Sequence, residues 1–278
     1  LAAARPRNLA VTADALYWSD VQVWRLPLAG GDAAPLFPEA LDPGALAMDA
    51  THAYFTEDTQ GAVMRVALDA SAPPQLIAMA ERPMAVAVDP THVYWTQAGP
   101  PGDQVDGALM RAPLDGSAAP ELLAMGTEPD GLTLALAGVI WADGGAGAVL
   151  LTPRAGGATT PLATDQPRPN HVATDDVYAY WTDPLEGHVA KAPLSGGPVS
   201  LVSQAHTGAA GITYREETLY WVADQDNALL RIQADSKQMR EMIRFDGELT
   251  NITAVDASYV YYATTYPDGS GAVKRVAR

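Results

Sequence analysis

The sequence predicts an all-β fold: a seven-bladed β-propeller built from four-stranded antiparallel blades. Three observations predict it. Variants of one four-residue motif recur at intervals of roughly forty residues, a proline precedes most of them at a constant distance, and each block divides into four short apolar runs without a useful helical period. Seven such sheets set radially around a channel protect their strand edges by repetition.

The recurring motif is clearest at Tyr180-Trp181-Thr182-Asp183. Eleven residues before its first position stands Pro169, and this offset never slips from block to block. The constant offset therefore ties the start of each block to its motif. The seven variants begin at Tyr17, Tyr54, Tyr94, Ile140, Tyr180, Tyr220 and Tyr261, and the preceding positions are Pro6, Pro43, Pro83, Pro129, Pro169, Ala209 and Thr250.

The second block illustrates how one blade is expected to form. Its four runs are rich in the apolar, aromatic and β-branched residues that suit a pleated, half-buried surface, and polar turns separate them. We expect these runs to form an antiparallel meander. The expected strands are Ala45–Met48, Ala53–Thr56, Val63–Leu68 and Gln75–Met79.

The side chains of the motif have structural interpretations. The Trp or Phe supplies bulk for packing one blade on the next, and roughly 150–250 Å² is buried per aromatic side chain. The acid that ends four variants (Asp20, Glu57, Asp143 and Asp183) is expected either to accept backbone N–H bonds in the following turn or to pair with a basic residue on the third strand.

We expect a single domain over residues 1–278, with repeats at about 6–42, 43–82, 83–128, 129–168, 169–208, 209–249 and 250–278 plus 1–5. The last block stops at Arg278, which aligns with Leu68 at the end of a third strand. It therefore lacks a fourth strand of its own. We expect the N-terminal segment to complete the last blade.

Composition narrows the classes of partner and site. There is no cysteine, which excludes disulfides, thiolate metal sites and a cysteine nucleophile. Seventeen Lys and Arg against thirty-three Asp and Glu leave a net charge of −16, which repels nucleic acids and anionic membrane surfaces. The longest apolar run, Gly131 to Ala142, is too short to cross a bilayer, which needs about 20 residues. Because the chain begins with Leu1, we expect that a leader or another segment was removed and that the protein is secreted or periplasmic. We also expect a monomer.

The repeats resemble those of YWTD-type β-propellers, best known from lipoprotein-receptor ectodomains. The fifth block is the most similar, since its motif is followed by Lys191-Ala192-Pro193-Leu194 and a Ser195-Gly196-Gly197 turn. The resemblance spans the whole chain and implies the propeller architecture rather than an activity. Receptor domains of that family have six blades, whereas this chain carries seven motifs.

Candidate binding residues follow from the expected topology. The first strand of each blade enters the channel from one face, and the loop between the second and third strands returns to that face. Polar residues just after the proline positions should therefore gather at one channel mouth. They are Arg7, Asn8, Asp130, Asn170, His171 and Asn251.

The same face should be strongly negative, because its loops carry Asp20, Glu57, Asp58, Asp103, Asp106, Asp143, Asp183, Glu186, Asp224, Asp226 and Asp268. Two alternatives remain for it: a solvated acidic rim, or a Ca²⁺ or Mg²⁺ ion held by Asp130, Asn170 and Asn251. Of the histidines, His52 and His92 are expected in turns on the opposite face, and His188 and His206 in loops. Only His171 coincides with the mouth.

Two functions are compatible with these residues. The first is a non-enzymatic binding or scaffold module whose acidic mouth engages a protein, a glycan or a small cation, and the absence of Gly-x-Ser-x-Gly and of phosphate-binding glycine loops favours it. The alternative is a lactonase-like hydrolase or lyase, in which a metal polarises a carbonyl oxygen and His171 acts as the base.

Overall fold

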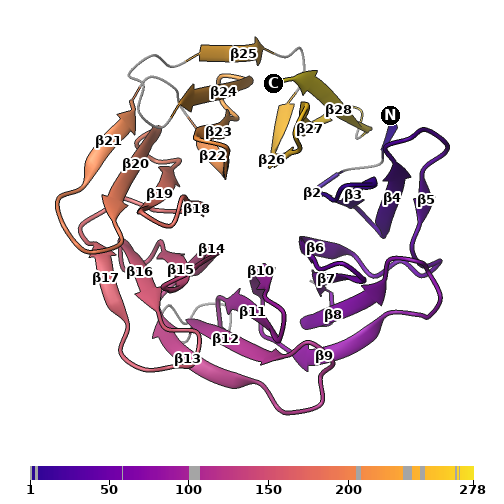
Figure 1. Ribbon diagram of the computed structural model, residues 1–278, viewed down its shortest axis with the longest axis horizontal. Coiled ribbons are helices and arrows are strands. Elements are labelled where there is room, and N and C mark those ends of the chain that lie inside the picture. The colour runs from indigo at the N-terminus through magenta and orange to yellow at the C-terminus, as the bar shows by residue number, and fades with distance from the viewer. Residues whose placement is uncertain are drawn as a thin grey trace.

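The computed structural model describes residues 2–3, 6–57, 59–99, 107–204, 208–233, 240–244, 248–266, 268 and 270–278. These residues form seven four-stranded sheets arranged as a ring around a central channel, as Figure 1 shows. No helix occurs among them, and hence none long and apolar enough to span a bilayer. The seven-bladed all-β propeller predicted from the repeats is confirmed.

Each of the first six sheets is a meander whose strands lie in chain order, innermost first. The first three blades contain β2 (Asn8–Val11), β3 (Ala15–Ser19), β4 (Val23–Pro27) and β5 (Ala34–Pro35); β6 (Pro43–Met48), β7 (His52–Glu57), β8 (Ala62–Ala67) and β9 (Gln75–Met79); and β10 (Pro83–Val88), β11 (His92–Gln97), β12 (Gly107–Pro113) and β13 (Glu121–Gly126). The next three contain β14 (Pro129–Ala135), β15 (Gly138–Asp143), β16 (Ala148–Thr152) and β17 (Thr160–Ala163); β18 (Val172–Thr174), β19 (Tyr178–Asp183), β20 (His188–Pro193) and β21 (Ser200–Ser203); and β22 (Ala209–Arg215), β23 (Thr218–Ala223), β24 (Ala228–Gln233) and β25 (Arg240–Arg244).

The seventh blade is closed by the N-terminal segment, as predicted. Its strands are β26 (Glu248–Val255), β27 (Tyr259–Thr265) and β28 (Gly271–Ala277), and β1 (Ala2–Ala3) pairs antiparallel with β28 at the outer edge. Ala2 lies opposite Ala272 in this pair. One blade therefore joins the two ends of the described chain.

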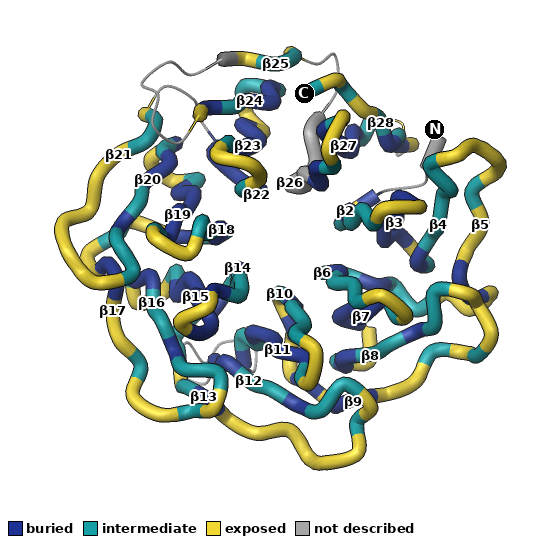
Figure 2. Tube along the Cα trace, viewed as in Figure 1, coloured by how far each residue is buried: buried dark blue, intermediate teal, exposed yellow. Residues whose placement is uncertain are grey.

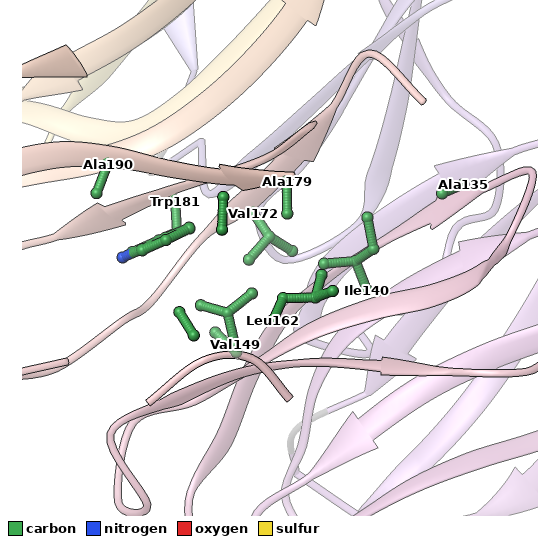
Figure 3. Close-up of a cluster of buried hydrophobic side chains, with 11 residues drawn as sticks. Ala135, Ile140, Val149, Leu162, Val172, Ala179, Trp181 and Ala190 are labelled. Carbon is green, nitrogen blue, oxygen red and sulfur yellow. The ribbon is translucent and has the colours of Figure 1, made fainter. Parts of the chain in front are cut away.

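The motif tryptophans pack the blades against one another. Trp18, Trp95, Trp141, Trp181 and Trp221 are all fully buried. Figure 3 shows Trp181 of β19 near Val149, Leu162 and Val172, in a cluster shared by the fourth and fifth blades. The second strand of each blade thus lies in the core, whereas the outer turns are exposed (Figure 2).

The motif tyrosines are held by a carboxylate five residues earlier. In four blades the tyrosine hydroxyl donates to an aspartate in the turn between the first and second strands, as Tyr54 does to Asp49 at 2.7 Å. Opposite the tyrosine, on the third strand, lies the basic residue, as in the pair of Tyr54 and Arg65. The same hydrogen bond from tyrosine to aspartate joins Tyr94 to Asp89, Tyr180 to Asp175, and Tyr261 to Asp256.

The motif acid accepts backbone N–H bonds, and the alternative pairing with the third-strand basic residue is wrong. Asp183 accepts the backbone N–H groups of Arg168, Leu185 and Glu186. The strand register places it opposite His188, whereas Lys191, the basic residue of the third strand, lies opposite Tyr180. The acid ends the second strand, so it lies over the turn, whereas the basic residue lies opposite the tyrosine three positions earlier.

Candidate functional site

The first strands are irregular where they enter the channel. The pairing of β6 with β7 shifts register between Pro43 and Leu46, and β14 and β15 shift between Pro129 and Leu132. A bulge frees a backbone N–H and turns neighbouring side chains to new directions. The residues just after the proline positions are therefore displayed at the channel mouth rather than packed in the regular sheet.

The third residue of the motif satisfies the backbone at this irregularity. Thr56 Oγ1 accepts the N–H of Ala45 at 2.8 Å, and Thr182 Oγ1 accepts the N–H of His171 at 3.3 Å. Ser19 and Thr96 do the same for Asn8 and Ala85. The sequence signal for this role is the Ser or Thr that recurs at the third position of the motif. Its hydrogen bond to the first strand was not among the predictions made from the sequence.

Three of the six predicted mouth residues form one cluster between the fourth and fifth blades. Asp130 lies on β14, and Asn170 and His171 immediately precede β18. The Asn170 side-chain amide donates a hydrogen bond to Asp130 Oδ2. His171 interacts electrostatically with Asp130, and its Nδ1 is buried without a hydrogen-bond partner among the described residues.

Gly131 allows the two blades to approach closely enough to form this cluster. Its N–H donates to the Asn170 carbonyl at 3.1 Å. A Cβ added at Gly131 would lie 2.7 Å from that carbonyl oxygen and 2.8 Å from the Cα of His171, and both are backbone atoms. Any other residue at position 131 would therefore push β18 away from β14.

Burial shifts the two titratable groups in opposite directions. It raises the pKa of the Asp130 carboxyl above its usual value, although His171 and Arg168 nearby oppose the change. It lowers the pKa of His171, with Asp130 opposing. Both residues are half-buried by surface area. Burial thus favours the neutral form of both side chains.

Two of the other three predicted residues, Arg7 and Asn8, do not join this cluster. Arg7 forms an ion pair with Asp42 at 2.7 Å, and Asn8 lies on β2, which Figure 1 shows across the channel from β14 and β18. Asn251 lies within β26, but its side chain falls outside the described part of the structure. Among the described mouth residues, the cluster of Asp130, Asn170 and His171 therefore lies at the fourth and fifth blades.

A pocket of ≈ 480 Å³ opens beside the cluster. It is lined by Arg82, Met84, Glu128, Asp130 and Arg168, among others. A second pocket of ≈ 360 Å³ lies on the side of the second blade, and Arg82 and Met84 line both. These two side chains thus separate two neighbouring hollows at the mouth.

Arg82, Glu128 and Arg168 also lie at the mouth, although the residues after the prolines did not predict them. Arg82 is exposed, has a φ of 47°, and its guanidinium has no ion pair or hydrogen bond within the described residues. Arg168 approaches Glu128 at 3.5 Å. The sequence signal was the residue before each proline, which is charged in all five blocks that have the proline: Arg5, Asp42, Arg82, Glu128 and Arg168.

Half of the eight described carboxylates expected at the acidic rim do not face solvent, whereas Glu186, Asp224 and Asp268 are exposed and Asp226 is half-buried. Asp20, Glu57, Asp143 and Asp183 are buried and accept backbone N–H bonds. Asp143 also receives the N–H of Glu128 at 2.9 Å, and so fixes a residue of the mouth pocket. Asp58, Asp103 and Asp106 lie outside the described residues.

The described side chains offer few oxygen ligands to a metal ion. No group of three or more His, Cys, Asp or Glu residues in the described ranges could hold one. At the predicted site, Asn170 presents its amide nitrogen to Asp130, so the two side chains form a hydrogen bond instead of a pair of oxygen ligands. The Ca²⁺ or Mg²⁺ site at Asp130, Asn170 and Asn251 stays a prediction.

The other histidines have structural surroundings. His52 and His92 lie beside turns on the face opposite the mouth, where the Nδ1 of each is 2.8 Å from the preceding threonine hydroxyl. His188 was expected in a loop, but this is wrong: it begins β20, because it pairs with Asp183 across the hairpin. His206 lies outside the described residues.

Comparisons with known proteins support the fold. No protein-family model matches the chain, and no curated protein matches it. A catalytically inactive variant of virginiamycin B lyase from Staphylococcus aureus, with one histidine replaced by alanine and with quinupristin, is a structural neighbour with a TM-score of 0.78. The two proteins are 14% identical over 98% of this chain and 95% of that one.

Two further structures are similar. Puromycin hydrolase has a TM-score of 0.78 at 14% identity, over 99% of this chain and 53% of the other. A nidogen/laminin complex contains a chain with a TM-score of 0.52 at 16% identity, over 86% of this chain and 80% of that chain. The last is a YWTD-repeat propeller, so the YWTD-like architecture is supported, but membership in that family is not established. At these identities the likeness shows the fold alone.

Proposed function

We propose that the protein binds a small organic molecule with an anionic group at the channel mouth. The observation that carries the proposal is the ≈ 480 Å³ pocket beside Asp130, Asn170 and His171. Its volume falls within the range of small-molecule sites, about 300–1,000 Å³. A binding role was also expected from the sequence. The ligand proposed here is a small organic molecule instead of a protein, a glycan or a cation.

Charge and polarity in the pocket support this ligand class. The Arg82 guanidinium has no partner in the described structure and is suited to a carboxylate or a similar group. Met84 and Pro129 offer apolar surface to the body of the ligand. Asp130 and Glu128 are acceptors for its hydroxyl or amino groups.

A thermal-shift screen with small carboxylates, amino acids, Ca²⁺ and Mg²⁺ tests the proposal. A ligand that raises the melting temperature should bind about tenfold or more weakly to Arg82→Gln, because one charge-assisted hydrogen bond is lost. Arg244→Gln is the matched control, since it removes an exposed arginine from the outer strand β25. Equal affinity of both variants would contradict the proposed site.

A specific observation favours a second candidate, an enzyme that moves a proton at the same mouth. The pKa of Asp130 is raised and that of the neighbouring His171 is lowered, a combination typical of acid and base pairs in active sites. The buried Nδ1 of His171 has no partner among the described residues. A lyase and a hydrolase are among the structural neighbours, which gives this candidate weak additional support.

The two candidates are separated by turnover of a ligand identified in the screen. An enzyme would lose turnover in His171→Ala while ligand binding persists, and its rate would fall as His171 becomes protonated at lower pH. Unchanged ligand after prolonged incubation with the native protein would leave the binding function alone. Secretion and a monomeric state stay predictions.

A further inference from the structure

Arginines on the third strand connect neighbouring blades on the face opposite the mouth. Arg65 of β8 donates through Nη1 to the carbonyl of Leu114 in the third blade at 3.0 Å. Arg111 of β12 donates in the same way to the carbonyl of Arg154 in the fourth blade. At these two seams a guanidinium thus occupies the space between one blade and the outer turn of the next.

The outer strand of the same blade holds each of these guanidinium groups. Gln75 Oε1 accepts from Arg65 at 3.0 and 2.8 Å, and Glu121 Oε2 accepts from Arg111 at 3.1 and 2.7 Å. Gln75 and Glu121 lie directly opposite their arginines in the strand register. An acceptor at this outer position therefore directs the arginine across the seam.

The first blade lacks that acceptor. Arg25 lies opposite Tyr17, as Arg65 lies opposite Tyr54, but its partner on β5 is Ala34. Because a methyl group cannot accept a hydrogen bond, Arg25 turns back to Tyr17 Oη at 3.3 Å and to Asp14 Oδ2 at 3.1 Å. Leu68 corresponds to Leu114, and its carbonyl receives no arginine from the described part of the chain.

A cleft of ≈ 690 Å³ opens at this first seam. It is lined by Tyr17, Arg25, Leu68 and Ala70, among others. At the next seam the corresponding space is closed: a Cβ added at Gly116, which matches Ala70 in the repeat, would lie 3.3 Å from both the Cα of Ile77 and the carbonyl oxygen of Leu76. The first blade leaves room because β5 has only two residues.

The walls of this cleft suit a cation with an apolar stem. Three carboxylates (Asp14, Asp32 and Asp69) against one guanidinium (Arg25) leave a net charge of −2. Asp14 is already paired with Arg25, whereas Asp32 has no partner among the described residues. Apolar atoms of Pro27, Pro35 and Leu36 can cover a methylene chain.

We propose that this cleft binds a guanidinium group supplied by a ligand. The group occupies the position that the side chains of Arg65 and Arg111 fill at the next two seams, donates to the Leu68 carbonyl, and pairs with Asp32 and Asp69. The guanidinium belongs either to a free small molecule or to an arginine side chain in a peptide. This site lies on the face opposite the channel mouth and is independent of the function proposed there.

Calorimetric titration with agmatine tests the proposal, because agmatine carries a guanidinium on a methylene chain. N-acetyl-arginine amide represents a peptide arginine, and comparing the two probes distinguishes the two sources. Asp32→Asn should weaken agmatine about tenfold, the effect of losing one hydrogen bond between charged groups. Arg244→Gln on the outer strand β25, outside both proposed sites, should leave agmatine binding unchanged.

Ala34→Gln is the decisive variant. The new glutamine should hold Arg25 as Gln75 holds Arg65, so that Arg25 reaches the Leu68 carbonyl and fills the cleft without any change in net charge. Agmatine binding should then fall by about tenfold or more, with an equal or higher melting temperature. Ser200→Gln, opposite Lys191 in the fifth blade, is the matched control and should bind agmatine normally.

Two results would overturn the proposal: no agmatine binding to the native protein, or equal binding by the native protein and both the Ala34→Gln and Asp32→Asn variants. Asp32 is exposed, so Asp32→Asn should fold normally. This variant therefore tests the proposal even where Ala34→Gln fails to fold.

Discussion

The carboxylate of Asp183 accepts the backbone N–H of Arg168 at 2.7 Å. Asp183 ends the motif of the fifth blade and is fully buried, whereas Arg168 precedes the proline of the same blade and lines the mouth pocket. A residue that marks the repeat therefore also fixes the backbone of a residue at the candidate site. Asp143 of the fourth blade does the same for Glu128, so the motif acids connect the architecture to the mouth at both blades.

Replacing Asp183 by alanine should be strongly destabilising. Three backbone N–H groups, of Arg168, Leu185 and Glu186, would lose their acceptor. We expect a loss of roughly 2–4 kcal/mol in the free energy of unfolding, measured by urea denaturation. Asp165→Ala, an exposed aspartate in the preceding loop, is the control. Equal losses in the two variants would show that the buried carboxylate is not special.

Gly131→Ala should disturb both stability and the mouth cluster. The added Cβ meets backbone atoms of Asn170 and His171 at 2.7 and 2.8 Å, so β18 must move. We expect a loss of about 1–3 kcal/mol, the usual effect of overpacking. Gly144→Ala at the same mouth is the matched control, since its Cβ would find its nearest atom at 3.4 Å. Thermal melts of both variants should differ clearly, and coinciding melts would contradict the close approach.

Two motif tryptophans should respond differently to phenylalanine. Trp141 donates through Nε1 to Thr152 Oγ1 at 2.9 Å in a buried site, whereas the Nε1 of Trp181 is buried without a partner among the described residues. Both Trp141→Phe and Trp181→Phe lose packing volume, but only the first loses a hydrogen bond. Trp141→Phe should therefore be the more destabilising by about 1 kcal/mol. Urea denaturation checks this, and the reverse order would refute it.

Stability at mildly acid pH should depend on His171. Because burial lowers its pKa below the usual 6.5, the unfolded chain binds the proton more readily than the folded protein. The contribution of His171 to stability is therefore complete above pH 6.5 and is lost as pH falls from there toward the lowered pKa. His171→Gln should reduce the fall in melting temperature across this window, whereas His92→Gln on the opposite face should not. Parallel curves for all three proteins would exclude this role.

The titration of Asp130 should change stability with pH in the opposite direction from that of His171. Its raised pKa means that, from pH 3.8 upward to that raised value, the folded protein binds the proton more readily than the unfolded chain. Stability therefore falls as pH rises through this window. Asp130→Asn should remove this fall in melting curves recorded across the acid range, and a curve that matches the native protein would contradict it.

The sequence predicted the fold because its signal is repeated. The motif and the proline offset place strands in all seven blocks, and the expected strand Gln75–Met79 coincides with β9. Asp130, Asn170 and His171 were found for the same reason, since each follows a proline at a fixed register. What the sequence could not show is which of the seven entry positions meet, because that depends on the close approach at Gly131.

The cleft at the first blade could not be predicted, because it depends on a missing hydrogen-bond acceptor on the outer strand. Arg25 matches its counterparts in sequence, and only the register opposite Ala34 reveals that it has lost its outer partner. The loop between the third and fourth strands differs in length from block to block, so this register cannot be read from the repeat. Arg82 and Arg168 lie before their prolines, so the register that predicts the residues after the prolines does not include them.

The pairing of β1 with β28 imposes an order on how the ring assembles. Each of the first six blades lies within one continuous stretch of chain and can form as soon as that stretch has been synthesised. The seventh must wait until Gly271 and Ala272 meet Ala3 and Ala2, which are synthesised before the strands of the other six blades. Because such a non-local contact is favoured only after the chain between has become compact, closure of the last blade should be the slow, final event of folding.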